Sequence, residues 1–290
     1  MADLDLRPLS LGEILDRTFT LYRRNFWLFA GITGIPNLLI LALNLFQTFT
    51  GTGGAVRRLP APVQQFQAGG SSGLLGLGII GALVGIVIYL VVYLFAQGGT
   101  VYAVSELYLG RTTTIGASLS RMRGQVGNLF GVSFLNGLAV LGAMIFLIIP
   151  GIYVACRLIT CIPAALLEDL GPSTSLSRSF ELTKDNAGRA FVIYLLYFIM
   201  LYAAILLLMS PFLFMVGIAA KDPGMVRVWL ALAQVGNVLA AILVSPFLTI
   251  ATAVFYYDLR VRKEAFDLQF MMNPGGNAPT GTAGVPTMLS

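Results

Sequence analysis

Long apolar runs separated by short charged segments set the pattern of this sequence. The five longest runs without a charged residue are Asn25–Val56, Leu59–Ser105, Gly124–Cys156, Ala190–Ala220 and Val228–Tyr257. A transmembrane helix needs about 20 mainly apolar residues to cross roughly 30 Å of hydrocarbon. Each run is therefore long enough to hold such a helix.

A sixth apolar segment, Gly151–Leu167, contains one charged residue, Arg157, and begins at the dipeptide Pro150-Gly151. This dipeptide between two apolar stretches is a turn signal. We therefore predict an all-α, polytopic membrane protein with six transmembrane helices arranged as three hairpins. The predicted spans cover about 26–48, 74–97, 128–149, 151–167, 190–216 and 228–257.

A short amphipathic helix at the membrane surface is expected before each hairpin, at about 10–24, 113–126 and 172–187. In the first of these, Ser10 and Glu13 fit a capping box at the helix start, and apolar residues recur at helical spacing. The whole membrane domain is predicted as one unit over residues 1–270. Residues 51–73 are predicted to form a flexible outer loop, and residues 271–290 a disordered cytoplasmic tail.

An internal repeat supports this organisation, because similar segments precede the hairpins. Leu15-Asp16-Arg17-Thr18-Phe19-Thr20-Leu21 matches Leu176-Ser177-Arg178-Ser179-Phe180-Glu181-Leu182, and Leu119-Ser120-Arg121 is a weaker middle copy. The repeating unit is a short cytoplasmic helix followed by a transmembrane hairpin.

Basic residues indicate the orientation, because cytoplasmic loops collect Lys and Arg. With the N-terminus inside, 13 basic residues fall on the inner side, 4 on the outer side, and Arg157 remains within a span. Both termini are therefore predicted to be cytoplasmic. The outer residues are Arg57, Arg58, Lys221 and Arg227.

Composition narrows the classes of function. Of the 290 residues, 57% are hydrophobic and 11% are charged, whereas soluble domains carry about 25% charged residues. The chain has no histidine and two cysteines, which excludes histidine general bases and histidine metal sites. We predict no catalytic residues, no metal site and no cofactor, and the scattering of the basic residues argues against a nucleic-acid partner.

Three separated motifs resemble one bacterial family of multi-span proteins. They are the segment from Arg7-Pro8 to Arg17, the turn Pro150-Gly151-Ile152-Tyr153 before Arg157, and Tyr256-Tyr257-Asp258-Leu259-Arg260-Val261-Arg262-Lys263-Glu264. They are similar to the family named for the glycerophosphodiester phosphodiesterase membrane domain. The resemblance implies a location in the bacterial cytoplasmic (inner) membrane and a multi-span architecture. It implies no activity, because the carboxylates and histidines of the phosphodiesterase barrel that is sometimes fused to this domain are absent.

The intramembrane Arg157 is the first candidate site, since an ionisable residue within a span is costly and often functional. It lies six residues into its predicted span, and Gln234, Asn237 and Asn44 are counted to similar outer depths. These residues are hypothesised to bind an anion such as a lipid phosphate or a carboxylate. The alternative is an arginine that snorkels to carbonyls and headgroups.

A second candidate is a charged layer at the cytoplasmic ends of the even-numbered spans. Acidic residues close these spans, and arginines occupy the matching positions of the three repeats. The set comprises Glu106, Glu168, Asp169, Asp258, Arg17, Arg121 and Arg178. The layer either docks a partner or forms ion pairs that fix the short helices.

The sequence thus predicts a non-enzymatic integral membrane protein, an architectural or regulatory module that binds phospholipid or a membrane-protein partner. A small-molecule or lipid transporter with an anion site near Arg157 is the alternative. Gly81 and Gly85 form a GxxxG pair, which serves either an intramolecular helix contact or a homodimer seam.

Overall fold

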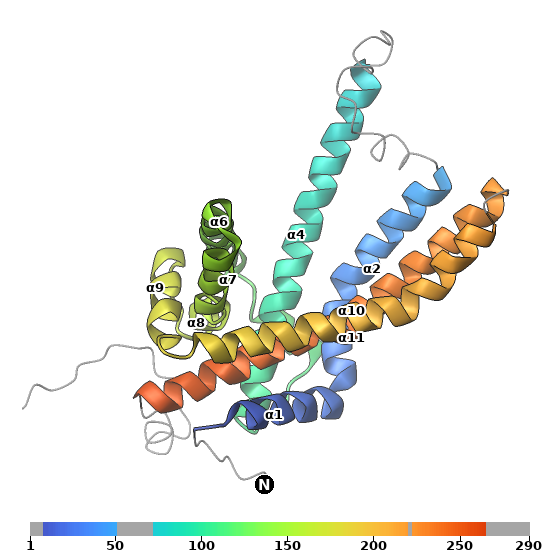
Figure 1. Ribbon diagram of the computed structural model, residues 1–290. Helices are drawn as coiled ribbons and strands as arrows, with labels where there is room; N and C mark the ends of the chain where they lie inside the picture. The colour runs from blue at the N-terminus through green and yellow to red at the C-terminus, as the bar shows by residue number, and fades with distance from the viewer. Residues whose placement is uncertain (1–7, 51–71, 220–221, 265–290) are drawn as a thin grey trace, which may run out of the picture. The chain divides into compact units, whose positions relative to one another are not determined.

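The computed structural model describes residues 8–50, 72–219 and 222–264, and every regular element in these ranges is a helix (Figure 1). The helices are α1 (Leu11–Arg24), α2 (Phe26–Thr50), α4 (Ser72–Tyr108), α5 (Ile115–Ser120), α6 (Val126–Phe146), α7 (Ile148–Arg157), α8 (Cys161–Leu167), α9 (Pro172–Leu182), α10 (Ala187–Ile218) and α11 (Pro223–Glu264). The predicted tail at 271–290 and the outer loop, except for its last two residues, lie outside the described ranges.

Six helical segments are long and apolar enough to cross a membrane. They are Phe26–Phe46, Val87–Tyr108, Val126–Phe146, Ile148–Leu167, Ala187–Ile218 and Pro223–Glu264. The helices α1, α5 and α9 precede the three pairs. This confirms the predicted all-α, polytopic membrane fold.

The turn between α6 and α7 differs from the turn predicted at Pro150-Gly151. Helix α6 ends at Phe146, Leu147 alone is extended, and α7 begins at Ile148. Pro150 therefore lies in the first turn of α7, where a missing N–H costs nothing because helix-start N–H groups have no intrahelical partner. Gly151 serves packing instead, since a Cβ there would lie 3.0 Å from the Cα of Met144 on α6.

The described helices fall into two compact units. Among the described residues, unit 1 takes in 8–32, 97–198 and 246–264, and unit 2 takes in 33–50, 72–96, 199–219 and 222–245. Helices α2, α4, α10 and α11 each contribute residues to both units. The short helices α1, α5 and α9 belong to unit 1.

The C-terminal part of α11 forms the core of unit 1. Every residue from Ile250 to Val261 is buried, although the segment includes Asp258 and Arg260. A helix buried on all faces must find a partner for each polar group it carries. The contacts of these charged residues therefore decide how unit 1 is built.

Small residues allow close contacts around this core. A Cβ on Gly31 of α2 would lie 2.6 Å from Ile115 of α5, and a Cβ on Gly131 of α6 would lie 2.8 Å from Pro172 of α9. Helix α1 begins with the predicted capping box, in which Ser10 and Glu13 each accept a backbone N–H of the other.

Unit 2 consists of segments of α2, α4, α10 and α11. Helices α10 and α11 approach closely at Gly236, where a Cβ would lie 2.9 Å from the carbonyl carbon of Leu208. At Gly85, half of the GxxxG pair, a Cβ would meet no described atom within 4 Å. An intramolecular contact, one of the two alternatives for this motif, is therefore not seen at Gly85 within the described part of the chain.

Candidate functional site

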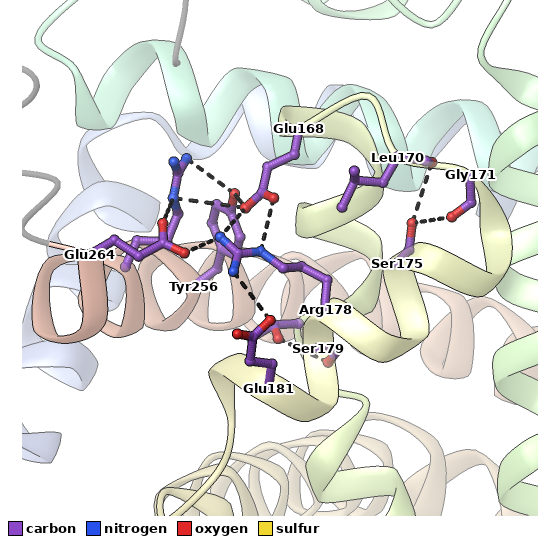
Figure 2. A network of polar contacts seen from close by, with 11 residues as sticks. Glu168, Leu170, Gly171, Ser175, Arg178, Ser179, Glu181, Tyr256 and Glu264 are labelled. Atoms are coloured by element: carbon purple, nitrogen blue, oxygen red, sulfur yellow. Dashed lines mark hydrogen bonds and ion pairs between the residues drawn. The ribbon is translucent and has the colours of Figure 1, made fainter. Parts of the chain in front are cut away.

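The residues predicted to form a charged layer all lie in unit 1, and Glu168 is at the centre of one group of contacts among them. Glu168 follows the last residue of α8, and its side chain is 2% exposed. Arg178 on α9 donates to both carboxylate oxygens, at 2.9 Å from Nε and 3.3 Å from Nη2. The hydroxyl of Tyr256 on α11 donates to Oε1 at 2.7 Å. Figure 2 shows these side chains pointing toward one another.

A second carboxylate, Glu264 at the end of α11, completes this cluster. It pairs with Arg178 and accepts from Nε of Arg260 at 2.9 Å. The Nε of Arg260 also lies 3.8 Å from Glu168 Oε1, and its side chain is 2% exposed. Two arginines thus face two glutamates, so that the buried charge is balanced. We call Glu168, Arg178, Tyr256, Arg260 and Glu264 the Glu168 cluster.

The environment of Arg178 favours its charged form. Burial lowers the pKa of its guanidinium, but the hydrogen bonds that it donates to Glu168 and Glu264, together with their negative charges, more than offset that effect and raise the pKa above its usual value. The exposed Glu181 lies 3.6 Å from Nη1 of Arg178 at the edge of the cluster. Arg178 therefore remains charged over the physiological range.

A second cluster surrounds Asp258 and holds the start of the chain. The fully buried carboxylate of Asp258 accepts from Arg189 of α10 at 2.8 Å and from Arg262 at 3.0 Å. It also accepts the backbone N–H of Leu9 at 2.6 Å. The carbonyl of Leu9 in turn accepts from Arg189 at 2.7 Å and from Arg262. The segment before α1 is thus attached to both α10 and α11.

A third acidic residue, Glu106, lies near the end of α4. Glu106 pairs with Arg121, the residue after α5, and lies 3.8 Å from Arg111. These pairs are more exposed than the other two clusters, since the side chains of Arg121 and Arg111 are 51% and 41% exposed. Surface pairs of this kind contribute about 0–1 kcal/mol. Their effect on stability is small beside that of the buried clusters.

The repeat predicted from the sequence therefore corresponds to a recurring contact in two of its copies. Arg121 pairs with Glu106, and Arg178 pairs with Glu168. The first copy differs, because Arg17 donates to the Tyr108 hydroxyl at 3.3 Å, while Arg189 and Arg262 pair with Asp258. The remaining predicted member, Asp169, accepts from the side chain of Gln125 at 3.1 Å.

Arg157 lies beside α9 in unit 1. Its Nη2 donates to the carbonyl of Phe180, and its Nη1 donates to Tyr153 at 3.2 Å. Its own carbonyl accepts from Ser179 and Thr183 at 2.9 and 2.8 Å. The sequence count assumed a helix starting at Gly151 on the outer side. These contacts instead join Arg157 to a helix expected on the cytoplasmic side.

The other three residues hypothesised to bind an anion belong to unit 2. Gln234 donates to the Thr48 hydroxyl at 3.0 Å, and this hydroxyl donates to the carbonyl of Asn44 at 2.8 Å. Asn237 is exposed. The structure thus connects Gln234 with Asn44 through Thr48.

Sequence reasoning missed several members of the buried clusters. A signal was present, because Tyr256, Arg260 and Glu264 recur every four residues, as do Asp258 and Arg262. Residues four apart share one face of a helix, so that two charged faces could have been predicted for this end of α11. Arg189 and the backbone of Leu9 carry no such signal.

The chemistry of these clusters is that of ion pairing. Their carboxylates already accept from arginine, tyrosine or backbone N–H groups. Among the described residues, no group of three or more Cys, Asp or Glu is placed to hold a metal ion. Comparisons with family models, curated proteins and solved structures give no match for this chain.

Proposed function

We propose that this integral membrane protein is a non-enzymatic architectural or regulatory module that binds anionic lipid headgroups on the cytoplasmic side. The observation that carries the proposal is a division of charge within unit 1. The buried acids and arginines are paired with one another, whereas a surplus of basic side chains is exposed. Paired charges hold the helices, and exposed basic side chains outside these pairs, such as Arg23 and Arg24, can bind anions.

The exposed surplus can be counted in the described part of unit 1. Eight basic side chains are exposed there, against four acidic ones. Clusters of basic residues beside a membrane attract anionic lipids with about 1 kcal/mol for each residue. The basic set is Arg23, Arg24, Arg111, Arg121, Arg123, Lys184, Arg262 and Lys263.

The junction of α1 and α2 is the best-placed part of this surface. Arg23 and Arg24 end α1 and are exposed, and Trp27, at the start of α2, is 83% exposed. Tryptophan is enriched at membrane–water interfaces, where its ring lies at the level of the headgroups. An exposed tryptophan next to two exposed arginines is the composition expected of a headgroup contact.

We propose that the protein lies in the bacterial cytoplasmic membrane with both termini in the cytoplasm. The distribution of basic residues and the resemblance to the bacterial membrane-domain family support this location. A membrane-protein partner or a second copy of the chain, in place of lipid, is the competing ligand for the basic surface.

Native mass spectrometry of the full chain from nanodiscs that contain phosphatidylglycerol and phosphatidylethanolamine tests this proposal. The R23Q/R24Q double variant should retain less phosphatidylglycerol, with affinity weakened by up to about 30-fold, from about 1 kcal/mol for each arginine. The R23K/R24K double variant keeps both positive charges, so it is the matched control and should retain the wild-type amount. Equal retention by all three proteins contradicts the proposal.

One observation favours transport of an anion as a second candidate. The Nε of Arg157 is buried and has no hydrogen-bond partner within the described residues, and a buried donor of this kind gains free energy from an anion or a polar ligand. Binding of inorganic phosphate or acetate should then raise the melting temperature of the wild type and leave that of Arg157→Gln unchanged. An equal response of the two proteins would reject this candidate.

A further inference from the structure

The adjoining ends of α6 and α7, together with the residue that joins them, are apolar. Residues 137–152 contain no charged, amide or hydroxyl side chain, and five consecutive residues at the tip are 66–85% exposed. These residues, which we call the hairpin tip, are Ile145, Phe146, Leu147, Ile148 and Ile149. Monomeric soluble surfaces rarely carry so continuous an apolar patch.

A single extended residue makes the turn at the hairpin tip. Leu147, its single extended residue, donates its N–H to Ala143 at 3.2 Å and accepts the N–H of Gly151 at 3.2 Å. Pro150 has no N–H. Ile148 and Ile149 begin α7, so their N–H groups have no partner within that helix. A turn of one residue keeps the number of such backbone groups lower than a longer loop would.

The described part of the turn that follows α10 is polar, in contrast to the hairpin tip. Between α10 and α11, the exposed Asp222 accepts the backbone N–H groups of Gly224 and Met225 at 2.8 and 3.3 Å. Helix α10 has 32 residues and is about 48 Å long at 1.5 Å per residue. It is therefore long enough to carry its turn past about 30 Å of hydrocarbon into water.

Contacts with α9 limit how far the tip of the α6–α7 pair can reach. Glu181 on α9 has a side chain that is 73% exposed, and a charged exposed side chain cannot lie in hydrocarbon at acceptable cost. The neighbouring carbonyl of Phe180 accepts from Arg157. From Arg157 to the tip, α7 has 10 residues, which span about 15 Å.

Contacts near the start of α6 also limit how far the hairpin tip can reach. Asn128 donates to the carbonyl of Leu170 at 2.9 Å, beside the exposed Asp169, and Gly131 faces Pro172 of α9. The 16 residues from Gly131 to Phe146 span about 24 Å. Both lengths, from Arg157 to the tip and from Gly131 to the tip, are shorter than the roughly 30 Å of hydrocarbon. The full helical segments are long enough to cross, but their parts beyond the contacts with α9 are not.

We propose that α6 and α7 form a re-entrant hairpin that enters from the α9 side of the membrane, and that its tip ends within the bilayer against lipid acyl chains. The flanking segments stay on one side of the membrane in either case, so that the predicted orientation does not change. The hairpin displaces lipid mainly from the leaflet next to α9. It is independent of the headgroup contacts proposed for Arg23 and Arg24.

Spin labels on single introduced cysteines test this inference in the full chain reconstituted into phosphatidylcholine–phosphatidylglycerol vesicles. Leu147→Cys and Ile149→Cys replace exposed side chains, so each should fold, and one variant suffices if the other fails. Met225→Cys, 52% exposed at the start of α11, is the control for a turn in water. The native Cys156 and Cys161 are buried and serve as a labelling blank.

At the tip we expect frequent collisions with oxygen, which concentrates in hydrocarbon, and few with a water-soluble nickel chelate. Met225→Cys should show the reverse. Free access of the nickel chelate to both tip labels would place the tip in water and overturn the inference. Low collision rates with both reagents would show that protein covers the tip, and would overturn it equally. Neither result affects lipid retention by R23Q/R24Q, so the two proposals fail separately.

Discussion

The exchange Glu168→Gln removes one negative charge from the buried Glu168 cluster while keeping the shape of the side chain. Arg178 and Arg260 then share the single carboxylate of Glu264, which leaves the cluster with one uncompensated positive charge. Breaking a buried ion pair by removing one partner costs about 3–5 kcal/mol, because the remaining charge stays desolvated. Since the amide oxygen can still accept from Tyr256, we expect a loss of about 3 kcal/mol in the free energy of unfolding.

Glu181→Gln is the matched control, because both residues contact the same arginine. Glu181 lies 3.6 Å from Arg178 with a side chain that is 73% exposed, whereas that of Glu168 is 2% exposed. An exposed pair contributes about 0–1 kcal/mol. The measurement is unfolding by sodium dodecyl sulfate in mixed micelles, followed by the fluorescence of Trp27 and Trp229.

A double-mutant cycle with Arg178→Gln shows whether the cost of Glu168→Gln comes from the pair itself. If the unpaired arginine causes the loss, the double variant should be destabilised by less than the sum of the two single variants. A Glu168→Gln protein as stable as Glu181→Gln would refute the reasoning. Additive losses in the cycle would show that the two residues act separately.

Other substitutions give further tests. Asp258→Asn should weaken the attachment of Leu9 and speed proteolysis near the N-terminus, and the exposed Asp16→Asn should cleave at the wild-type rate. Gly151→Ala should cost about 1–3 kcal/mol because its Cβ overpacks against Met144, whereas Gly142→Ala meets no described atom within 4 Å and should be neutral or slightly stabilising. Burial raises the pKa of Tyr22 to about 12, so the contribution of this tyrosine to stability is complete below pH 10 and falls as pH rises from about 10 to 12. The melting temperatures of wild type and Tyr22→Phe should therefore converge or cross in that range. A constant difference between the two melting temperatures would contradict the assignment.

The spans could be predicted from sequence because their length and composition are local properties. A run of about 20 apolar residues without charge has few alternatives to a membrane helix. The turn at Leu147 could not be placed as well, since Pro150 is compatible with a loop and also with the first turn of a helix. The structure places Pro150 inside α7, with Gly151 packed against Met144.

The candidate site was predicted in part for a similar reason. Repeat position and charge were sufficient to group the two arginines Arg121 and Arg178 with Glu106 and Glu168 in one charged set. The individual pairs, Arg178 with Glu168 and Arg121 with Glu106, come from the structure. The contact of Leu9 with Asp258 joins residues 249 positions apart and uses the backbone N–H of Leu9. No pattern of side chains in the sequence could therefore indicate it. The depth counted for Arg157 did not predict its contacts with α9, because the count started at Gly151, whereas α7 begins at Ile148 and Arg157 is its last residue.

The position of the charged clusters at one end of the helices explains why polar groups are used where apolar packing would be more stable. Apolar helices in lipid gain little from any particular register, because acyl chains solvate them as well as another helix does. A carboxylate that must meet two guanidinium groups is satisfied at one register only, and sliding by one residue leaves a buried charge unpaired. The Glu168 cluster sets this register for α8, α9 and α11, and the Asp258 cluster sets it for α10, α11 and the segment before α1. Within unit 1 the charges therefore select one arrangement of helices that lipid alone would not distinguish from its neighbours.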